Sequence, residues 1–228
     1  FWYVLAFLLR LLIAAIFYDK GDCPAFIETA QNVLLFHYPL YYEPTTFNDF
    51  VYPPLAYAVI LPGMGLYYLF GLDNVILRRV FLKLPIMLAD LWLAFMFKKS
   101  LISLNRTKQG IKSERFYALS WAEVLLLFNP FLIYSSAVKA QFFNVSVICM
   151  VYAWRTYQNE KDLISGFWAA AAILIKQYSV IFAVFLGWVL LKQSFKRTVN
   201  FVIGAVLITI PTLAIGAVCL LYTSDAAD

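Results

Sequence analysis

Long apolar runs recur along the chain and alternate with short polar joints. Segments approaching roughly 20 apolar residues match the hydrocarbon thickness of a bilayer, so we predict membrane-spanning helices. These runs cover residues 1–17, 80–97, 117–134, 142–154, 163–175, 179–191 and 199–218. Within them apolar and polar residues do not alternate, which argues against strands. The pattern therefore predicts an all-α polytopic membrane protein.

Two stretches interrupt this pattern. Residues 19–52 form a polar, aromatic-rich loop, in which residues 25–36 carry apolar side chains at helical spacing. This spacing predicts a helix that lies on the membrane surface. Residues 53–70 are moderately apolar but contain Pro62 and Gly63, which disfavour a helix interior. We expect this second stretch to be broken and not to cross the membrane.

Composition agrees with the membrane assignment. Of the 228 residues, 63% are hydrophobic and 14% charged, whereas soluble domains carry about 25% charged residues. This excludes water-soluble enzymes, nucleic-acid binders and disordered tails. Most Lys and Arg residues fall at 98–116, 155–162 and 192–197, so we expect these loops to be cytoplasmic. The 19–52 loop and the joints at 139–141 and 176–177 are then extracytoplasmic.

The two chain ends predict a fragment. The chain begins at Phe1 inside an apolar run, and residues 219–228 resemble one translated frame of a transposase sequencing adapter. We therefore expect truncation at both ends, with residues 1–218 forming one partial transmembrane module and residues 219–228 an adapter artefact. The complete open reading frame tests this expectation.

Several short motifs follow one another along the chain. They are Gly21-Asp22, Tyr52-Pro53-Pro54-Leu55, Ala89-Asp90-Leu91, Gln141-Phe142 and Lys176-Gln177. In this order the motifs resemble those of the GT-C superfamily of membrane glycosyltransferases. The similarity is greatest to the polyprenyl-phosphate-glucose-dependent glucosyltransferases of N-glycan assembly and their prokaryotic relatives. The resemblance covers roughly residues 10–191 and implies a GT-C-like transmembrane helical module. The segments after Asp22 and around Gln141 depart from the family pattern, which bears on the sugar and the acceptor.

The resemblance implies a reaction as well as a fold. Such enzymes move a hexose, with inversion, from a polyprenyl-phosphate sugar donor to a hydroxyl of a lipid-linked or other glycan acceptor outside the cytoplasm. Asp22 matches the catalytic aspartate of the family and is expected to be the general base. The departing phosphate needs its charge held, for which Lys176 is the first candidate, followed by Lys139 and Arg79.

Neutral side chains complete the expected substrate site. Gln177 and Gln141 are candidates for binding sugar hydroxyls or phosphate oxygens, and Tyr52 for an aromatic floor beneath the sugar or prenyl group. We expect no cofactor and no metal site, although Asp19 and Asp22 are also a possible carboxylate pair for a divalent metal.

Each of the charged candidates also has a structural interpretation. Asp22 is a possible N-cap of the surface helix, and Lys139 and Lys176 are able to extend to the membrane interface without a catalytic role. Arg10 and Asp90 lie inside predicted spans, where an internal ion pair explains both.

A transporter or flippase fragment, acting on lipid-linked or small polar substrates, is the alternative function. Transporters place substrate groups near the bilayer midplane in repeated broken helices, whereas the polar motifs here fall at helix ends on one face. A non-catalytic assembly subunit is a third option. In each case we expect an integral multi-pass protein of a bacterial or archaeal cell membrane, or of the endoplasmic reticulum in a eukaryote, with the bilayer as partner and no nucleic acid.

Overall fold

The computed structural model describes residues 1–37, 52–106 and 121–225, and this part of the chain is built from helices without strands. The expected all-α class is therefore confirmed for the described residues. The main helices are α1 (Trp2–Ile16), α2 (Asp22–Leu34), α3 (Tyr57–Leu69), α4 (Val75–Arg106), α6 (Pro130–Ile133), α7 (Phe143–Gln158), α8 (Asp162–Ile175), α9 (Val180–Gln193) and α10 (Phe195–Asp225).

Three helical segments are long and apolar enough to cross a membrane: Val75–Ser100, Trp121–Val138 and Phe195–Val218. The other apolar helices are shorter than a straight helix needs to be to cross the hydrocarbon core of a bilayer. For example, α8 and α9 each have 14 residues, or about 21 Å of helix, against about 30 Å of bilayer core. Large apolar side chains nevertheless point outward along α9, among them Ile181, Val184 and Trp188, as expected of a surface that meets lipid.

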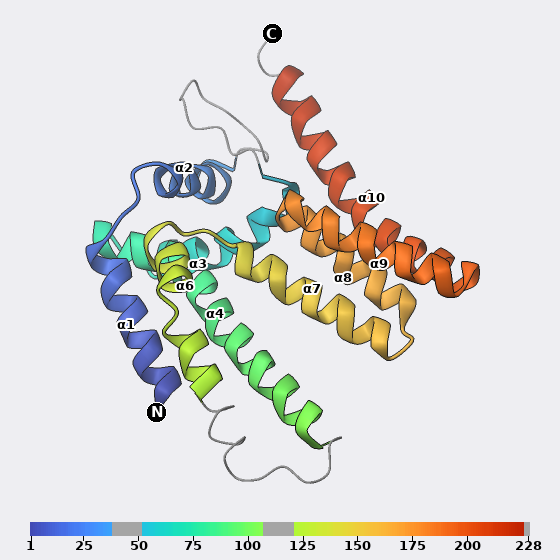
Figure 1. Cartoon of the computed structure of the whole chain (residues 1–228). Helices are drawn as coiled ribbons and strands as arrows, with labels where there is room; N and C mark the ends of the chain where they lie inside the picture. Colours follow the sequence, from blue (N-terminus) through green and yellow to red (C-terminus); the bar gives the residue numbers. More distant parts are fainter. Residues whose placement is uncertain (38–51, 107–120, 226–228) are drawn as a thin grey trace.

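The helices form two adjoining groups (Figure 1). In one, α1 and α3 pack against α4; in the other, α8 packs between α7 and α10, and α7 also contacts α4. Helix α2 lies across one end of the first group, against α3, and its position at a membrane surface stays a prediction (Figure 1). It begins at Asp22, before the predicted start at residue 25.

The expectation of a broken 53–70 stretch is wrong. After a 3-10 turn (η1, Pro54–Ala56), α3 continues through Pro62 to Leu69. Gly63 explains why this helix packs well: an added Cβ there would lie 2.1 Å from the carbonyl oxygen of Phe81 in α4. The missing side chain lets the two backbones approach, and tertiary packing outweighs the low helix propensity of Pro and Gly.

The loop expected from residue 98 also begins later, because α4 extends to Arg106. The run predicted from residue 117 is described only from Trp121 onward. Its helix ends before Asn129, as the Asn129-Pro130 pair leads one to expect. The Asn129 side chain accepts hydrogen bonds from the amides of Phe131 and Leu132, and so caps α6.

Helices α8 and α10 come into close backbone contact where each helix carries a glycine. A Cβ added to Gly166 would lie 1.8 Å from the carbonyl oxygen of Phe201, and one added to Gly204 would lie 1.8 Å from that of Leu163. We expect Gly166→Ala to lower the free energy of unfolding by about 1–3 kcal/mol, because the backbones of α8 and α10 must move apart. Gly65→Ala is the control, since a Cβ there meets nothing within 4 Å. Equal melting temperatures for the two variants in detergent would contradict this close crossing.

Candidate functional site

The N-terminus of α2 presents Asp22. Asp19, just before the helix, accepts hydrogen bonds through Oδ2 from the backbone amides of Gly21 (3.1 Å) and Asp22 (2.9 Å). Asp19 therefore caps these amides, and the interpretation of Asp22 as the helix N-cap is wrong. The Asp22 carboxylate is left to make contacts outside its own helix.

The joint before α7 presents Gln141. A π-helical turn (η2, Tyr134–Val138) ends here, and Ala140 adopts a left-handed conformation with φ of 56°. The backbone N–H of Gln141 then donates to the carbonyl oxygen of Ser135 at 2.8 Å, which closes the turn. This reversal aims the Gln141 side chain at the N-terminus of α2.

The break after α8 presents Lys176. The helix ends at Ile175, Lys176 is extended, and a short 3-10 turn (η3, Gln177–Ser179) leads into α9. Ser146 of α7 fixes this break: its Oγ donates to the carbonyl oxygen of Ala172 at 3.0 Å and lies 2.5 Å from Oγ of Ser179.

These three elements bring a carboxylate, an amide and an ammonium group together. Gln141 Nε2 donates a hydrogen bond to Asp22 Oδ2, and Lys176 Nζ donates one to Gln141 Oε1 at 2.9 Å. The side-chain amide of Gln141 thus links the Asp22 carboxylate to the Lys176 ammonium. All three side chains are partly buried. We call Asp22, Gln141 and Lys176 the charge bridge.

An aromatic wall covers one side of the charge bridge. Tyr52, Phe142 and Phe26 pack with ring centroids 4.9 to 5.7 Å apart. Lys176 Nζ lies 4.1 Å from the centre of the Tyr52 ring and 5.1 Å from that of Phe142. The ammonium is therefore stabilised by two ring faces as well as by Gln141.

Burial changes the proton affinity of this ammonium. It lowers the pKa of Lys176 to about 8, and the nearby Asp22 carboxylate opposes this shift only in part. Burial also raises the pKa of the Tyr52 hydroxyl, although its hydrogen bond with Gln141 acts in the opposite direction. Lys176 is accordingly a cation that titrates close to physiological pH.

Two further predicted cations, Arg79 and Lys139, lie against tyrosine rings. The Arg79 guanidinium stacks over the Tyr18 ring at 4.0 Å, and Lys139 Nζ lies 5.7 Å from the centre of the Tyr134 ring. Within the described part of the chain, no hydrogen bond or ion pair joins either cation to Asp22 or Gln141, and their expected role as further phosphate ligands stays a prediction. Gln177 begins η3 beside Lys176 and is exposed.

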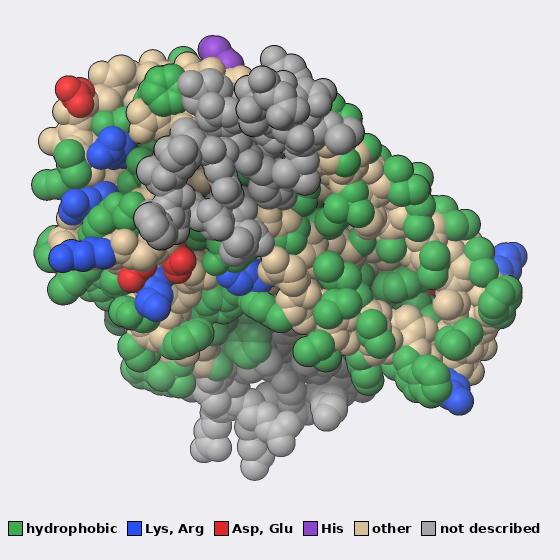
Figure 2. Space-filling model, turned by 90° about the horizontal axis from the view of Figure 1, so that it is seen from above, with side chains coloured by type: hydrophobic (Ala, Val, Ile, Leu, Met, Phe, Trp, Pro, Cys, Tyr) green, Lys and Arg blue, Asp and Glu red, His purple; other side chains and the backbone are tan. Residues whose placement is uncertain are grey.

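The face that carries α2 also shows charged side chains. Viewed from this side, acidic and basic side chains gather toward the end formed by α1 and α2, next to a largely apolar body (Figure 2). Among the residues that the structure describes, no group of three or more His, Cys, Asp and Glu side chains is placed to hold a metal ion.

Sequence reasoning missed Phe26 and Phe142 as members of the wall. Both had a local signal: Phe142 adjoins Gln141, and Phe26 lies one helical turn after Asp22, so each shares a helix face or a joint with a predicted site residue. The conformation of Ala140 had none, because alanine rarely adopts positive φ.

Comparison with known proteins adds no relative: no protein-family model, no curated protein and no solved structure matches the chain.

Proposed function

We propose that this chain is part of the catalytic module of a polytopic membrane glycosyltransferase. It transfers a hexose from a polyprenyl-phosphate sugar to a hydroxyl of a glycan acceptor, with inversion at the anomeric carbon. The single observation that carries the proposal is the charge bridge, in which three separate chain segments hold a carboxylate and an ammonium around one amide. The order of motifs along the sequence supports the same reaction.

Asp22 is the general base in this proposal. An acceptor hydroxyl is a weak nucleophile at neutral pH, and a positioned carboxylate removes its proton as the new bond forms. Asp19 takes over the capping of α2, so the Asp22 carboxylate is available at the start of the helix. Its side chain faces Gln141 and not its own helix, which places it beside Lys176 in the same site.

Lys176 holds the leaving group. The acceptor oxygen bonds to the anomeric carbon, its proton passes to Asp22, and the bond from that carbon to the phosphate oxygen breaks. The electron pair of this bond leaves with the polyprenyl phosphate, which gains one negative charge. An ammonium in a partly dehydrated site stabilises that charge more strongly than water does. The Tyr52 ring beside Lys176 offers an apolar face to the sugar or the first prenyl unit.

The proposed location is a cell membrane or the endoplasmic reticulum membrane, with the charge bridge on the extracytoplasmic side. Asp22, Gln141 and Lys176 all lie at helix termini or in joints, not in the middle of a span. The loops rich in Lys and Arg connect the opposite helix ends, which the positive-inside rule assigns to the cytoplasm.

A reconstituted assay tests the proposal. The protein, expressed from its complete open reading frame, is placed in liposomes with short-chain polyprenyl-phosphate β-glucose labelled at the anomeric carbon, and with a panel of glycan acceptors. We expect an α-glucoside and an equal amount of free polyprenyl phosphate. If a panel of hexose donors gives no glycoside, while labelled donor crosses the bilayer, the transporter alternative replaces the proposal.

The pKa of Lys176 gives a pH dependence. Below about pH 8 the ammonium is charged and able to hold phosphate; above that pH it loses its proton and the charge. We expect kcat/KM, which reports on the free enzyme, to fall above about pH 8, to roughly a tenth of its maximum at pH 9. Bound phosphate stabilises the charged ammonium and so raises its pKa in the substrate complex. The fall in kcat should therefore begin at a higher pH than the fall in kcat/KM.

Lys176→Arg separates this effect from general alkaline inactivation. A guanidinium keeps its charge throughout this range, so the descending limb should move beyond pH 10 even if the maximum falls. Lys192→Arg is the matched control, since Lys192 lies over Trp188 at the far end of α9. An unchanged limb in Lys176→Arg would remove Lys176 from the role of phosphate ligand.

A further inference from the structure

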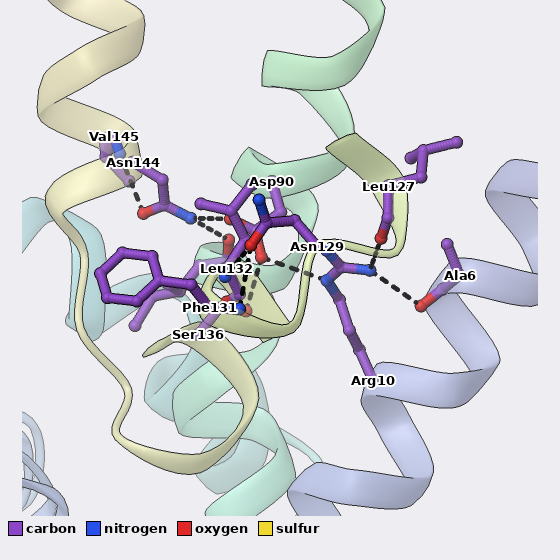
Figure 3. A network of polar contacts seen from close by, with 11 residues as sticks. Ala6, Arg10, Asp90, Leu127, Asn129, Phe131, Leu132, Ser136, Asn144 and Val145 are labelled. Carbon is purple, nitrogen blue, oxygen red and sulfur yellow. Dashed lines mark hydrogen bonds and ion pairs between the residues drawn. The ribbon is translucent and has the colours of Figure 1, made fainter. Parts of the chain in front are cut away.

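A buried polar network is centred on Asp90 of α4 (Figure 3). Arg10 Nε donates to Asp90 Oδ2 at 3.1 Å, and the two side chains are 0% and 1% exposed, which confirms the expected internal ion pair. Ser136 Oγ donates to the same oxygen at 2.5 Å, and Asn144 Nδ2 donates to Asp90 Oδ1 at 2.5 Å. Both carboxylate oxygens are therefore used.

The two neutral donors lie on either side of the joint that carries Gln141. Ser136 belongs to η2, which precedes the joint, and Asn144 lies in the first turn of α7, which follows it. Asn144 also donates to the carbonyl oxygen of Ile86 in α4 at 2.9 Å. One carboxylate on α4 thus anchors both ends of the joint.

Asp90 is itself held in place. Arg10 Nη1 donates to the carbonyl oxygens of Ala6 (3.2 Å) and Leu127 (2.8 Å), so the guanidinium is fixed by α1 and by the end of the helix before Asn129 (Figure 3). The network consequently joins α1, α4 and the helix that ends before Asn129 to η2 and α7, the two elements that flank the joint.

The joint needs such anchoring. Ala140 is fully buried and left-handed, a conformation that costs an L-residue about 1–2 kcal/mol. A conformation of this kind persists where the surrounding structure determines it, and such positions cluster at functional sites. Here the turn at Ala140 is what directs Gln141 to Asp22 and Lys176.

We propose that Asp90, Ser136 and Asn144 are positioning residues, which act through the joint to hold Gln141 between Asp22 and Lys176. This inference rests on the proposed function for its effect on turnover. The hydrogen bonds of Ser136 and Asn144 lead to Asp90 and not to the charge bridge, so these residues influence the reaction by holding the Gln141 side chain in place.

A double-mutant cycle tests the inference. Ser136→Ala removes one anchor and leaves the pair of Arg10 and Asp90 intact. We expect kcat to fall about tenfold with KM changed less than about twofold, because the substrate still binds while the bridge is misaligned. In a Gln141→Ala background the same substitution should lower kcat by less than about twofold, since the group it positions is gone.

Ser165→Ala is the matched control. Ser165 Oγ also makes a buried hydrogen bond between two helices, to the carbonyl oxygen of Ala153 at 2.8 Å, but near the start of α8, away from Lys176. It should leave kcat unchanged. Asn144→Ala is the second variant, which cuts the other anchor, and should behave as Ser136→Ala does.

A second readout does not depend on turnover. The rate of Lys176 acylation as a function of pH measures the pKa of its ammonium in the empty protein, where Asp22 and Tyr52 are the titratable groups facing it. With Gln141 displaced, water reaches the ammonium, so we expect the pKa to rise from about 8 toward the ordinary lysine value in Ser136→Ala and Asn144→Ala. Ser165→Ala should show no rise.

The outcomes separate the two proposals. A wild-type protein that transfers no sugar, but whose Lys176 pKa responds to both substitutions, contradicts the proposed function and supports the positioning network. A pKa that stays constant in both variants overturns the network, as does a loss of kcat that is equally large with and without Gln141.

Discussion

Asp22→Asn is expected to lower kcat by about 10²–10⁴-fold, the usual contribution of a general base. The asparagine side chain keeps the shape of the aspartate, and its carbonyl oxygen still accepts from Gln141 Nε2. The substitution therefore removes the ability to take a proton with little change in geometry. Binding of the donor, which depends on Lys176 and the aromatic wall in the proposed mechanism, should remain within about threefold of the wild type.

Asp19→Asn provides the control for this experiment. Asparagine caps helices as well as aspartate does, so the start of α2 should be preserved and kcat should change little. If Asp19 and Asp22 instead hold a divalent metal together, both substitutions should lower kcat strongly, and added metal should restore part of it. Turnover of Asp22→Asn near the wild-type rate would exclude Asp22 as the base.

The buried pair of Arg10 and Asp90 gives the largest expected effect on stability. Arg10→Met leaves the Asp90 carboxylate buried with its countercharge removed. We expect the free energy of unfolding to fall by about 3–5 kcal/mol. The double variant Arg10→Met/Asp90→Leu should recover much of this loss, because replacing both ions removes the uncompensated charge. Folding is followed by thermal unfolding in detergent, together with protease resistance in liposomes.

A surface pair shows what an exposed interaction is worth in the same protein. Arg197 lies 4.0 Å from Glu160, whose side chain is 82% exposed, so Glu160→Gln should change the free energy of unfolding by less than about 1 kcal/mol. If Arg10→Met is no more destabilising than Glu160→Gln, the pair does not stabilise the fold.

Hydropathy predicted the helices well where packing follows composition. The apolar runs near α1, α4, α8 and α10 are helices in the structure, as their composition predicts. It failed at α3, where Pro62 and Gly63 indicated a break. The close contact of Gly63 with Phe81 is a tertiary feature, and no local pattern contains it.

The candidate site was predictable in part for a related reason. The order of short motifs, together with a common side for their loops, predicts that Asp22, Gln141 and Lys176 lie near one another, and the structure brings them together. Their roles stay predictions. Arg79 and Lys139 are predicted as further cations of the same site, and in the structure each lies against a tyrosine ring. Sidedness restricts which residues can meet; only packing decides which of them do.

The amide at the centre of the site has a consequence for the resting protein. Its nitrogen bonds the Asp22 carboxylate and its oxygen bonds the Lys176 ammonium, so both charged groups already have a hydrogen-bond partner before a ligand binds. A substrate that arrives exchanges one hydrogen-bonding partner for another, instead of displacing loosely held water from two isolated ions. The side chains of the charge bridge are thereby held in fixed positions before a substrate binds.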